Sequence, residues 1–269
     1  MKITAIIASA RKKGNTYKVV RQIEDIIKAD YPDTDFIYYY PSEHDTNFCK
    51  GCTICITKGE HLCPHYQTVD ELEKLITESD GVILASPVYV MQVSALMKNL
   101  LDHFAYRWHR PKFFNQRVIT VATSAAAGFV GKDTVGYMEL CAKNMGMIPS
   151  GKINVIGDEF PQSEQVRKKE ESQIRKVTGA FISSLKNGKL PKPSIKDLFW
   201  FRIWQTTTRI GEKEKMADFR YWSEKGWYNS DYYYPASIDP VTGTVLKAFG
   251  AMVRNSFRHS FENHQEKTK

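Results

Sequence analysis

The stretch KITAIIASARKKGNTYKVVRQIEDIIK, residues 2–28, decides the fold. It opens with Lys2–Ala8, a short apolar run that predicts a buried strand. Val and Ile then recur at helical spacing over Thr16–Lys28, which predicts a helix with one face against that strand's sheet. A short polar loop, Ser9–Thr16, joins the two elements. This order of strand, loop and amphipathic helix is the first half of a β–α–β unit.

The same alternation continues along the chain. Thr68, with Glu71 three residues later, predicts a capping box at the start of its helix. Further strands are expected at Asp35–Tyr40, Gly81–Ser86, Gln116–Thr123 and Ile153–Ile156, and further helices at Thr68–Ser79, Ser94–Phe104, Thr134–Met145 and Ser163–Lys186. Five strands separated by helices predict an α/β fold with a doubly wound parallel sheet. Its commonest strand order is the flavodoxin-like order 2-1-3-4-5.

The composition changes after Gly188, where Lys189–Pro193 forms a linker-like break. We therefore expect one domain over residues 1–188 and an aromatic-rich, mainly helical C-terminal extension over residues 189–269. In the extension, Ser194 and Asp197 predict a capped helix, and another helical stretch runs from about Val245 to Phe261. The aromatic side chains of the extension have large apolar surfaces, which we expect to be buried. We expect the extension to be a dimer arm or a lid, with a membrane-surface anchor as the alternative.

The overall composition excludes several classes of protein. No apolar run approaches the roughly 18 residues of a transmembrane helix, and the N-terminus lacks a signal-peptide pattern. We therefore expect a cytoplasmic protein with reduced thiols. The net charge of +8 favours an anionic cofactor or partner. No nucleic-acid-binding motif accompanies it, so we expect no nucleic-acid partner.

The loop after the first strand reads S-x-R-x-x-G-N-T, from Ser9 to Thr16. A helix amino terminus offers unpaired N–H groups and a positive dipole end. Ser9, Asn15 and Thr16 add neutral hydrogen-bonding groups, Arg11 adds a charge, and Gly14 allows a tight turn. This set favours a phosphate monoester. The alternative is an ordinary strand–helix turn with an N-cap.

Two other loops stand where ligands bind in such sheets. The third strand ends in Ser86-Pro87-Val88-Tyr89-Val90-Met91, which offers backbone N–H groups and an apolar wall suited to a flat heteroaromatic ring. The fourth expected strand leads into Ser124-Ala125-Ala126-Ala127-Gly128. These loops and Ser9–Thr16 follow strands whose carboxyl ends share one edge of the sheet.

The second strand is followed by a cysteine loop with the spacing C-x2-C-x2-C-x7-C, formed by Cys49, Cys52, Cys55 and Cys63. Such spacing lets one loop turn several sulfurs toward a common centre. An iron–sulfur cluster, a zinc ion and unmetallated thiols are all consistent with it. The fifth cysteine, Cys141, lies in a helix pattern and is expected in the core.

Taken in order, these motifs and Lys98-Asn99-Leu100-Leu101-Asp102 resemble those of NAD(P)H-dependent FMN reductases and, more narrowly, of iron–sulfur flavoproteins. The resemblance covers about residues 1–186. It implies FMN, with Ser9, Arg11, Asn15 and Thr16 at its phosphate. It also implies that Pro87, Val88, Tyr89 and Met91, with the adjoining Val90, contact the isoalloxazine, and that Ser124, Ala125, Ala126 and Gly128 line its other side. The four cysteines of the loop would carry a [4Fe–4S] cluster.

The resemblance also implies a function and an assembly. We expect an FMN-dependent oxidoreductase that moves electrons from NAD(P)H, or from a reduced carrier, to a quinone, a flavin or a protein. The chain would form a homodimer or tetramer. No residue need act as a covalent catalyst, because FMN supplies the chemistry. One alternative is a non-enzymatic iron–sulfur flavoprotein that carries electrons between partner proteins. Another is a binding module with a zinc-stabilised loop.

Overall fold

A computed structural model describes the chain except residues 45–46, 127–128, 159 and 268–269, and describes only the backbone beyond Ser256. The described residues divide into two compact units. The first comprises Met1–Cys52 and Pro64–Leu190, and the second comprises Thr53–Cys63 and Pro191–Lys269. Across the described residues, no helix has the length and apolar character needed to cross a membrane.

The first unit is built on a sheet whose five long strands are parallel and follow the order β2-β1-β3-β5-β6. The strands are β1 (Lys2–Ile7), β2 (Asp35–Tyr39), β3 (Gly81–Tyr89), β4 (Gln92–Val93), β5 (Arg117–Ser124) and β6 (Ile148–Ile156). The predicted flavodoxin-like order is therefore confirmed. The sequence did not lead us to expect β4, a two-residue strand that forms a hairpin with the end of β3.

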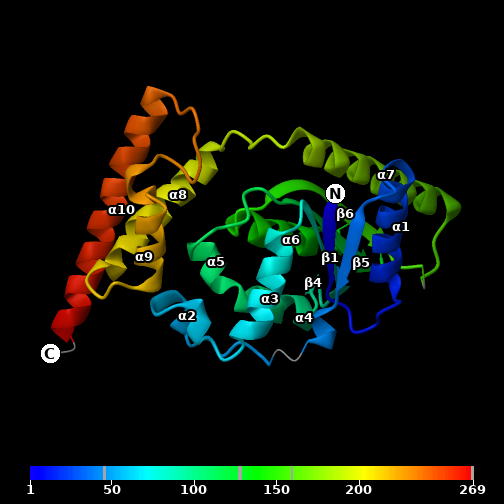
Figure 1. Cartoon of the computed structure of the whole chain (residues 1–269), viewed down its shortest axis with the longest axis horizontal. Coiled ribbons are helices and arrows are strands. Elements are labelled where there is room, and N and C mark those ends of the chain that lie inside the picture. Colours follow the sequence, from blue (N-terminus) through cyan, green and yellow to red (C-terminus); the bar gives the residue numbers. More distant parts are fainter. Residues whose placement is uncertain (45–46, 127–128, 159, 268–269) are drawn as a thin grey trace. The chain divides into compact units, whose positions relative to one another are not determined.

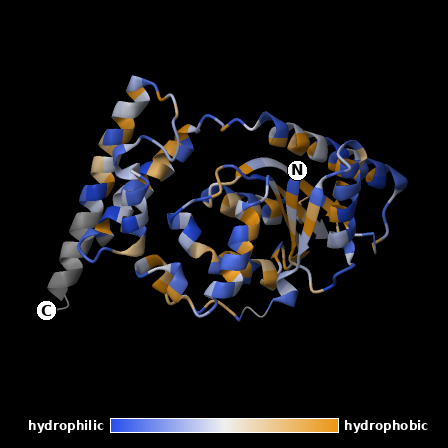
Figure 2. Cartoon of the chain, in the orientation of Figure 1, coloured by the Kyte–Doolittle hydropathy of each residue, from blue (hydrophilic) through white to orange (hydrophobic). Residues whose placement is uncertain are grey.

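Helices cover both faces of this sheet (Figure 1). Those of the first unit are η1 (Pro41–Glu43), α1 (Asn15–Asp30), α3 (Tyr66–Thr77), α4 (Ala95–His103), α5 (Ala105–His109), α6 (Lys132–Asn144) and α7 (Glu164–Asn187). Helices α1 and α7 pack on one face, where alternate strand residues such as Ile3, Ile83 and Ile119 meet Ile23 and Phe181. Figure 2 shows the hydrophobic strands inside the helical layers. Because the five long strands are parallel, their carboxyl ends lie along the same edge of the sheet, and the helices on its faces hold that edge in place.

Two predicted boundaries are wrong for local reasons. Helix α3 begins at Tyr66 with His65 as its N-cap residue, so Thr68 lies inside the helix and forms no capping box. Strand β6 begins at Ile148, five residues earlier than predicted, and the pairing of β5 with β6 shifts register between Val118 and Ile119. The register skips Ser150, an irregularity that accommodates the Pro and Gly near the start of the strand.

The second unit has a core of its own, made of aromatic rings that pack mostly edge-to-face or tilted. Its helices are α2 (Ile54–Thr57), η2 (Glu60–Leu62), α8 (Ile195–Thr207), η3 (Thr208–Glu212), α9 (Ala217–Glu224), η4 (Trp227–Asn229) and α10 (Pro240–Lys267). Trp222 is fully buried, with the rings of Phe201 and Trp227 centred 5.5 and 5.2 Å away. The predicted capping box is present, because Ser194 accepts from Asp197 N–H and the Asp197 carboxylate accepts from Ser194 N–H. Aromatic burial thus stabilises this unit.

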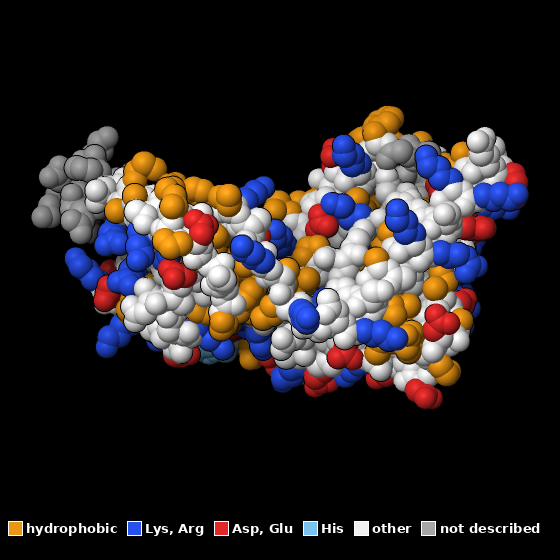
Figure 3. All heavy atoms as spheres, turned by 90° about the horizontal axis from the view of Figure 1, so that it is seen from above, with side chains coloured by type: hydrophobic (Ala, Val, Ile, Leu, Met, Phe, Trp, Pro, Cys, Tyr) orange, Lys and Arg blue, Asp and Glu red, His pale blue; other side chains and the backbone are white. Residues whose placement is uncertain are grey.

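Its surface is also partly apolar. Figure 3 shows hydrophobic side chains gathered over the part of the chain next to the grey C-terminal residues. The exposed large hydrophobic residues of the second unit include Leu62, Ile195, Trp200, Ile210, Val241, Val245 and Met252. On the face in this view, Lys and Arg side chains are interspersed with acidic ones and do not form one broad basic patch (Figure 3).

Candidate functional site

The loop after β1 ends at the amino terminus of α1, which carries no protein cap. Gly14 is the N-cap residue, no side chain caps the helix, and the first turn has no acidic residue. The first N–H groups of a helix have no partner within the helix. Ser9, Asn15 and Thr16 are buried beside them, whereas Arg11 is exposed. This terminus therefore offers donors and a positive dipole end to an anion.

A polar atom in this loop is left without a partner. Asn15 is 7% exposed, and its Oδ1 has no hydrogen-bond partner among the described residues. The chain after β6 comes close to it: a Cβ atom on Gly157 would lie 2.0 Å from Asn15 Nδ2. A larger residue at position 157 would force the Asn15 side chain to move. Since an oxygen buried without a hydrogen bond is costly, Oδ1 favours a ligand that carries a hydroxyl or N–H donor.

A pair of hydroxyls joins the loop after β1 to the end of β5. Thr16 Oγ1 lies 2.7 Å from Thr123 Oγ1, and both side chains are buried. In such a pair one hydroxyl donates and the other keeps its hydrogen for a further acceptor. Ser94 makes a second link, because its hydroxyl donates to the Ala8 carbonyl at 2.6 Å. The loops after β1, β3 and β5 are thus tied together at one edge of the sheet.

The loop after β3 is a tight hairpin under strain. Val88 pairs with Val93 and Tyr89 pairs with Gln92, which leaves Val90 and Met91 as a two-residue turn. Their φ angles are 49° and 64°. Positive φ at both positions is the pattern of a type I′ turn, which favours Asn-Gly. Val90 is nevertheless 98% exposed and Met91 46% exposed. A strained turn that holds apolar side chains in the open suggests a ligand-binding role.

The residues at the end of β5 form the last part of the ligand-facing edge of the sheet. Ser124 is buried, and its hydroxyl donates to the Ala126 carbonyl at 2.7 Å. Its own carbonyl accepts from Gly157 N–H at 2.9 Å, next to Asn15. Ala125 and Ala126 are exposed. Gly128, which we predicted to line the flavin, and Ala127 lie outside the described residues.

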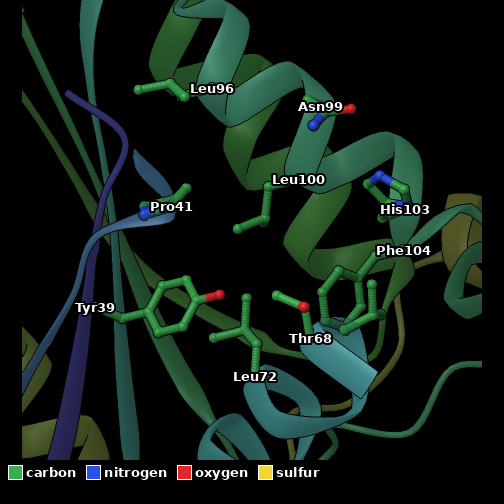
Figure 4. Close-up of a pocket in the computed structure, with 10 residues that line it drawn as sticks. Tyr39, Pro41, Thr68, Leu72, Leu96, Asn99, Leu100, His103 and Phe104 are labelled. Atoms are coloured by element: carbon green, nitrogen blue, oxygen red, sulfur yellow. The ribbon is translucent and has the colours of Figure 1, made fainter. Parts of the chain in front are cut away.

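The cysteine loop follows β2, and helix α4 holds its first half. The Cys49 N–H donates to Asn99 Oδ1 at 3.0 Å. His103 Nε2 lies 2.8 Å from the Asn47 carbonyl and therefore donates to it. Both α4 residues line a small apolar pocket of about 40 Å³, with Tyr39 and Pro41 on its opposite side (Figure 4). Sequence reasoning gave Asn99 and His103 no such role, although both stand on a helix that follows a predicted ligand loop.

The thiols differ in exposure, and none of the five cysteines forms a disulfide bond. Cys49 and Cys52 are exposed, Cys55 and Cys63 are half-buried, and Cys141 is buried as expected. Positive φ angles recur between them, at Gly51 and Thr53. In the part of the chain that the structure describes, no three His, Cys, Asp or Glu side chains are gathered as metal ligands.

Comparison with known proteins is decisive for the family. A family model described as NADPH-dependent FMN reductase matches residues 1–162. An iron–sulfur flavoprotein from Archaeoglobus fulgidus is 31% identical over 231 residues, which cover 84% of this chain and 100% of that protein. Another, from Clostridioides difficile, is 30% identical over 201 residues, covering 75% of this chain and 86% of that protein.

The chain belongs to the NADPH-dependent FMN reductase family.

Its likeness to iron–sulfur flavoproteins extends further than the motifs indicated. The predicted first domain, 188 of 269 residues, is about 70% of the chain, so a match over 84% continues into the C-terminal extension. Solved structures share the fold. An oxidoreductase from Corynebacterium diphtheriae has a TM-score of 0.52 at 15% identity over 69% of this chain and 97% of that one. An FMN-dependent NADH-azoreductase from Bacillus anthracis, in complex with FMN, has 0.50 at 10% identity over 66% and 98%.

The residues of this FMN reductase family member fit FMN. The uncapped α1 terminus matches a terminal phosphate, and the partnerless Asn15 Oδ1 matches a hydroxyl of the ribityl chain. The exposed hairpin at Val90 and Met91 offers an apolar surface for a ring. The cysteine loop fits a cluster by donor type, since four thiolates are the usual ligand set of [4Fe–4S].

Proposed function

We propose that this chain is an FMN-dependent oxidoreductase that takes electrons from NAD(P)H, or from a reduced carrier. The acceptor would be a quinone, a flavin or a protein. Family membership supports the FMN-dependent oxidoreductase class. The main structural support for FMN as the cofactor is the uncapped amino terminus of α1. Asn15 Oδ1 is buried beside it without a hydrogen-bond partner among the described residues. A ligand with both a phosphate and hydroxyl groups would satisfy both features.

Each loop would have a separate task in holding FMN. The α1 terminus, Arg11 and the Thr16–Thr123 hydroxyl pair would bind the phosphate. Tyr89, Val90 and Met91 would cover part of the ring and exclude water from it. When bound, FMN accepts a hydride and passes on its electrons singly or in pairs. The protein's contribution is therefore position and electrostatics, and no side chain acts as a covalent catalyst.

Removal of the Arg11 charge tests the phosphate assignment. A hydrogen bond to a charged group contributes roughly 1.5–3 kcal/mol, so Arg11→Ala should raise the Kd for FMN about 10–100-fold. Riboflavin, which lacks the phosphate, should bind the variant as it binds the wild type. Lys13→Ala is the matched control, because Lys13 is an exposed cation in the same loop. Equal losses for FMN and riboflavin, or equal losses in both variants, would contradict the assignment.

We propose that Cys49, Cys52, Cys55 and Cys63 hold a [4Fe–4S] cluster. The spacing of the four thiols supports this, and two similar proteins are named iron–sulfur flavoproteins. A structural zinc ion is the main alternative, since four thiolates also suit Zn²⁺. Iron, sulfide and zinc should be measured on anaerobically purified protein. About four irons and four sulfides per chain are expected, and stoichiometric zinc would contradict the proposal.

The same cysteine loop keeps a second function open, that of a non-enzymatic electron carrier between proteins. Rapid anaerobic mixing separates the two. An enzyme bleaches its bound FMN with NADH or NADPH at a rate that saturates with nucleotide. A carrier is bleached only by a reduced protein such as ferredoxin. The measurement also identifies the nicotinamide donor.

We propose that the C-terminal extension serves as a dimer arm or lid. Its exposed apolar residues, such as Trp200, Val245 and Met252, support an interaction with another protein surface. Truncation after Gly188 should yield monomers or aggregates with altered flavin accessibility, measured by light scattering and flavin fluorescence quenching. A truncated dimer with unchanged flavin binding and turnover would count against both roles.

A further inference from the structure

The second half of the cysteine loop packs within the C-terminal unit. Thr53–Cys63 belongs to the same compact unit as Pro191–Lys269, and α2 contacts α9 there. Arg220 on α9 makes the connecting hydrogen bond, because its Nη2 donates to the Lys58 carbonyl at 2.9 Å. Its other terminal nitrogen, Nη1, donates to the Lys215 carbonyl at 2.5 Å. One guanidinium thus joins the cysteine segment to the turn before α9.

The segment needs such a partner because α2 is only four residues long. Helices much shorter than 12–15 residues are marginal in water by themselves. Lys58 is the C-cap residue of α2, and the last carbonyls of a helix have no partner within it. A cation at this end also interacts favourably with the helix dipole. Arg220 therefore satisfies a group that α2 leaves open.

Unusual backbone at the N-cap of α2 indicates that its surroundings hold the helix in place. Thr53 begins the helix with φ 57°, and Gly59 follows it with φ 141°. A Cβ atom on Gly59 would lie 2.6 Å from the His61 ring. Lys215, whose carbonyl Arg220 binds, also has positive φ, at 48°. Non-glycine residues keep such angles only where neighbouring contacts impose them.

We propose that α9, through Arg220, positions the half of the cysteine loop that carries Cys55 and Cys63. This inference rests on the proposed role of the four cysteines as ligands of an inorganic centre. It gives the C-terminal extension a task inside its own chain, in addition to that of an arm or lid. The half-buried state of Cys55 and Cys63, against the exposed Cys49 and Cys52, agrees with it. Each half of the loop is then positioned by its own hydrogen bonds, the first half by Asn99 and His103 and the second by Arg220.

Thiol alkylation of the metal-free protein tests this without reference to activity. Iodoacetamide labelling, resolved by peptide mass spectrometry, gives a rate for each cysteine. Arg220→Ala should raise the rates at Cys55 and Cys63 about 3–10-fold, because the opening of α2 costs less without its hydrogen bond. Cys49 and Cys52 should keep their rates, and the buried Cys141 should stay slow. Arg220→Lys, which retains a donor and a charge, should restore part of the protection.

Arg209→Ala is the matched control for a lost cation in the same unit. Arg209 stacks on the Tyr228 ring at 4.5 Å and donates to the Tyr228 carbonyl, so its loss should leave Cys55 and Cys63 unchanged. Unchanged rates at Cys55 and Cys63 in Arg220→Ala would overturn the inference. So would a parallel rise at Cys141, because that result means general loosening of the fold.

A second measurement separates this inference from the proposed cluster. After anaerobic reconstitution, Arg220→Ala should retain less iron per chain than Arg209→Ala following desalting. If wild-type protein never takes up iron, the cluster proposal fails, while the alkylation rates still decide the role of Arg220. If wild-type protein takes up iron and Arg220→Ala holds it equally well with unchanged alkylation, the positioning role fails alone.

Discussion

The hairpin turn at Val90 and Met91 should store strain that substitution can release. Each residue sits at positive φ, a conformation that costs a non-glycine residue roughly 1–2 kcal/mol. In Val90→Asn/Met91→Gly the turn receives the residues that a type I′ turn favours. Glycine reduces this gain by roughly 0.5–1 kcal/mol, because it increases the conformational entropy of the unfolded chain. Val90 is 98% exposed, so its replacement sacrifices almost no burial, whereas loss of the Met91 side chain, 46% exposed, costs roughly 1 kcal/mol.

The net gain in the free energy of unfolding is therefore about 1–2 kcal/mol. For a chain of this size each kcal/mol raises Tm by about 2–4 °C, so the double variant should melt about 2–8 °C higher. The assay must use flavin-free protein, because a ligand that binds only the native state adds stability of its own. The same variant should bind FMN about tenfold more weakly, since it lacks the apolar surface that we assign to the ring.

Val90→Thr is the control for this reasoning. It keeps the branched side chain at the same φ, so the stability of flavin-free protein should change by less than about 0.5 kcal/mol. If the double variant is no more stable than the wild type, the turn is not strained and its exposed residues need no functional explanation. If it is more stable and binds FMN normally, the strain is real but the assignment of the ring site to this turn is wrong.

Two hydrogen-bonded sites elsewhere in the first unit, Glu73 and the Thr16–Thr123 pair, yield further predictions. Burial alone would raise the pKa of Glu73, but hydrogen bonds from Arg107, Lys112 and Tyr106 hold it at about 2, below its ordinary 4.5. Because the folded-state value is depressed, about 3 kcal/mol of stability is present above pH 4.5 and is lost as the pH falls toward 2. Glu73→Gln should remove that acid dependence, in urea titrations at several pH values, and should cost about 3–5 kcal/mol at pH 7. For the Thr16–Thr123 hydroxyl pair, a double-mutant cycle with valine at each position should give a coupling energy of about 0.5–1.5 kcal/mol, and additive effects would contradict a direct hydrogen bond.

The centre of the sheet was predictable from sequence because β1, β3 and β5 are buried on both faces. Every residue of β5 is buried, and a continuous apolar run bounded by turns has few other structures available. The short strand β4 was not predicted because Gln92–Val93 can pair with β3 only if Val90 and Met91 form a tight turn at positive φ. Both residue types disfavour that turn. Local conformational preference therefore argues against the hairpin, and tertiary contacts impose it.

The candidate site was predictable only in part. Loops after β1, β3 and β5 were expected at one edge, because parallel strands end together. The residues that link those loops, such as Thr123 and Ser94, carry no motif and emerge only from pairing across the sheet. Arg220 lies 162 positions from Lys58, and no spacing rule relates residues so far apart.

The C-terminal unit is discontinuous in sequence, and this orders events during synthesis. Pro64–Pro191, the 128 residues that follow Cys63 up to the start of the second segment, must be translated before that unit can begin to assemble. At roughly 5–20 residues per second, this takes about 6–25 s. Throughout that interval Cys55 and Cys63 have been synthesised, but the helix that contacts their segment has not. If the proposed cluster forms, iron or sulfide that reaches the chain in this interval would meet the cysteine segment before α9 packs against it.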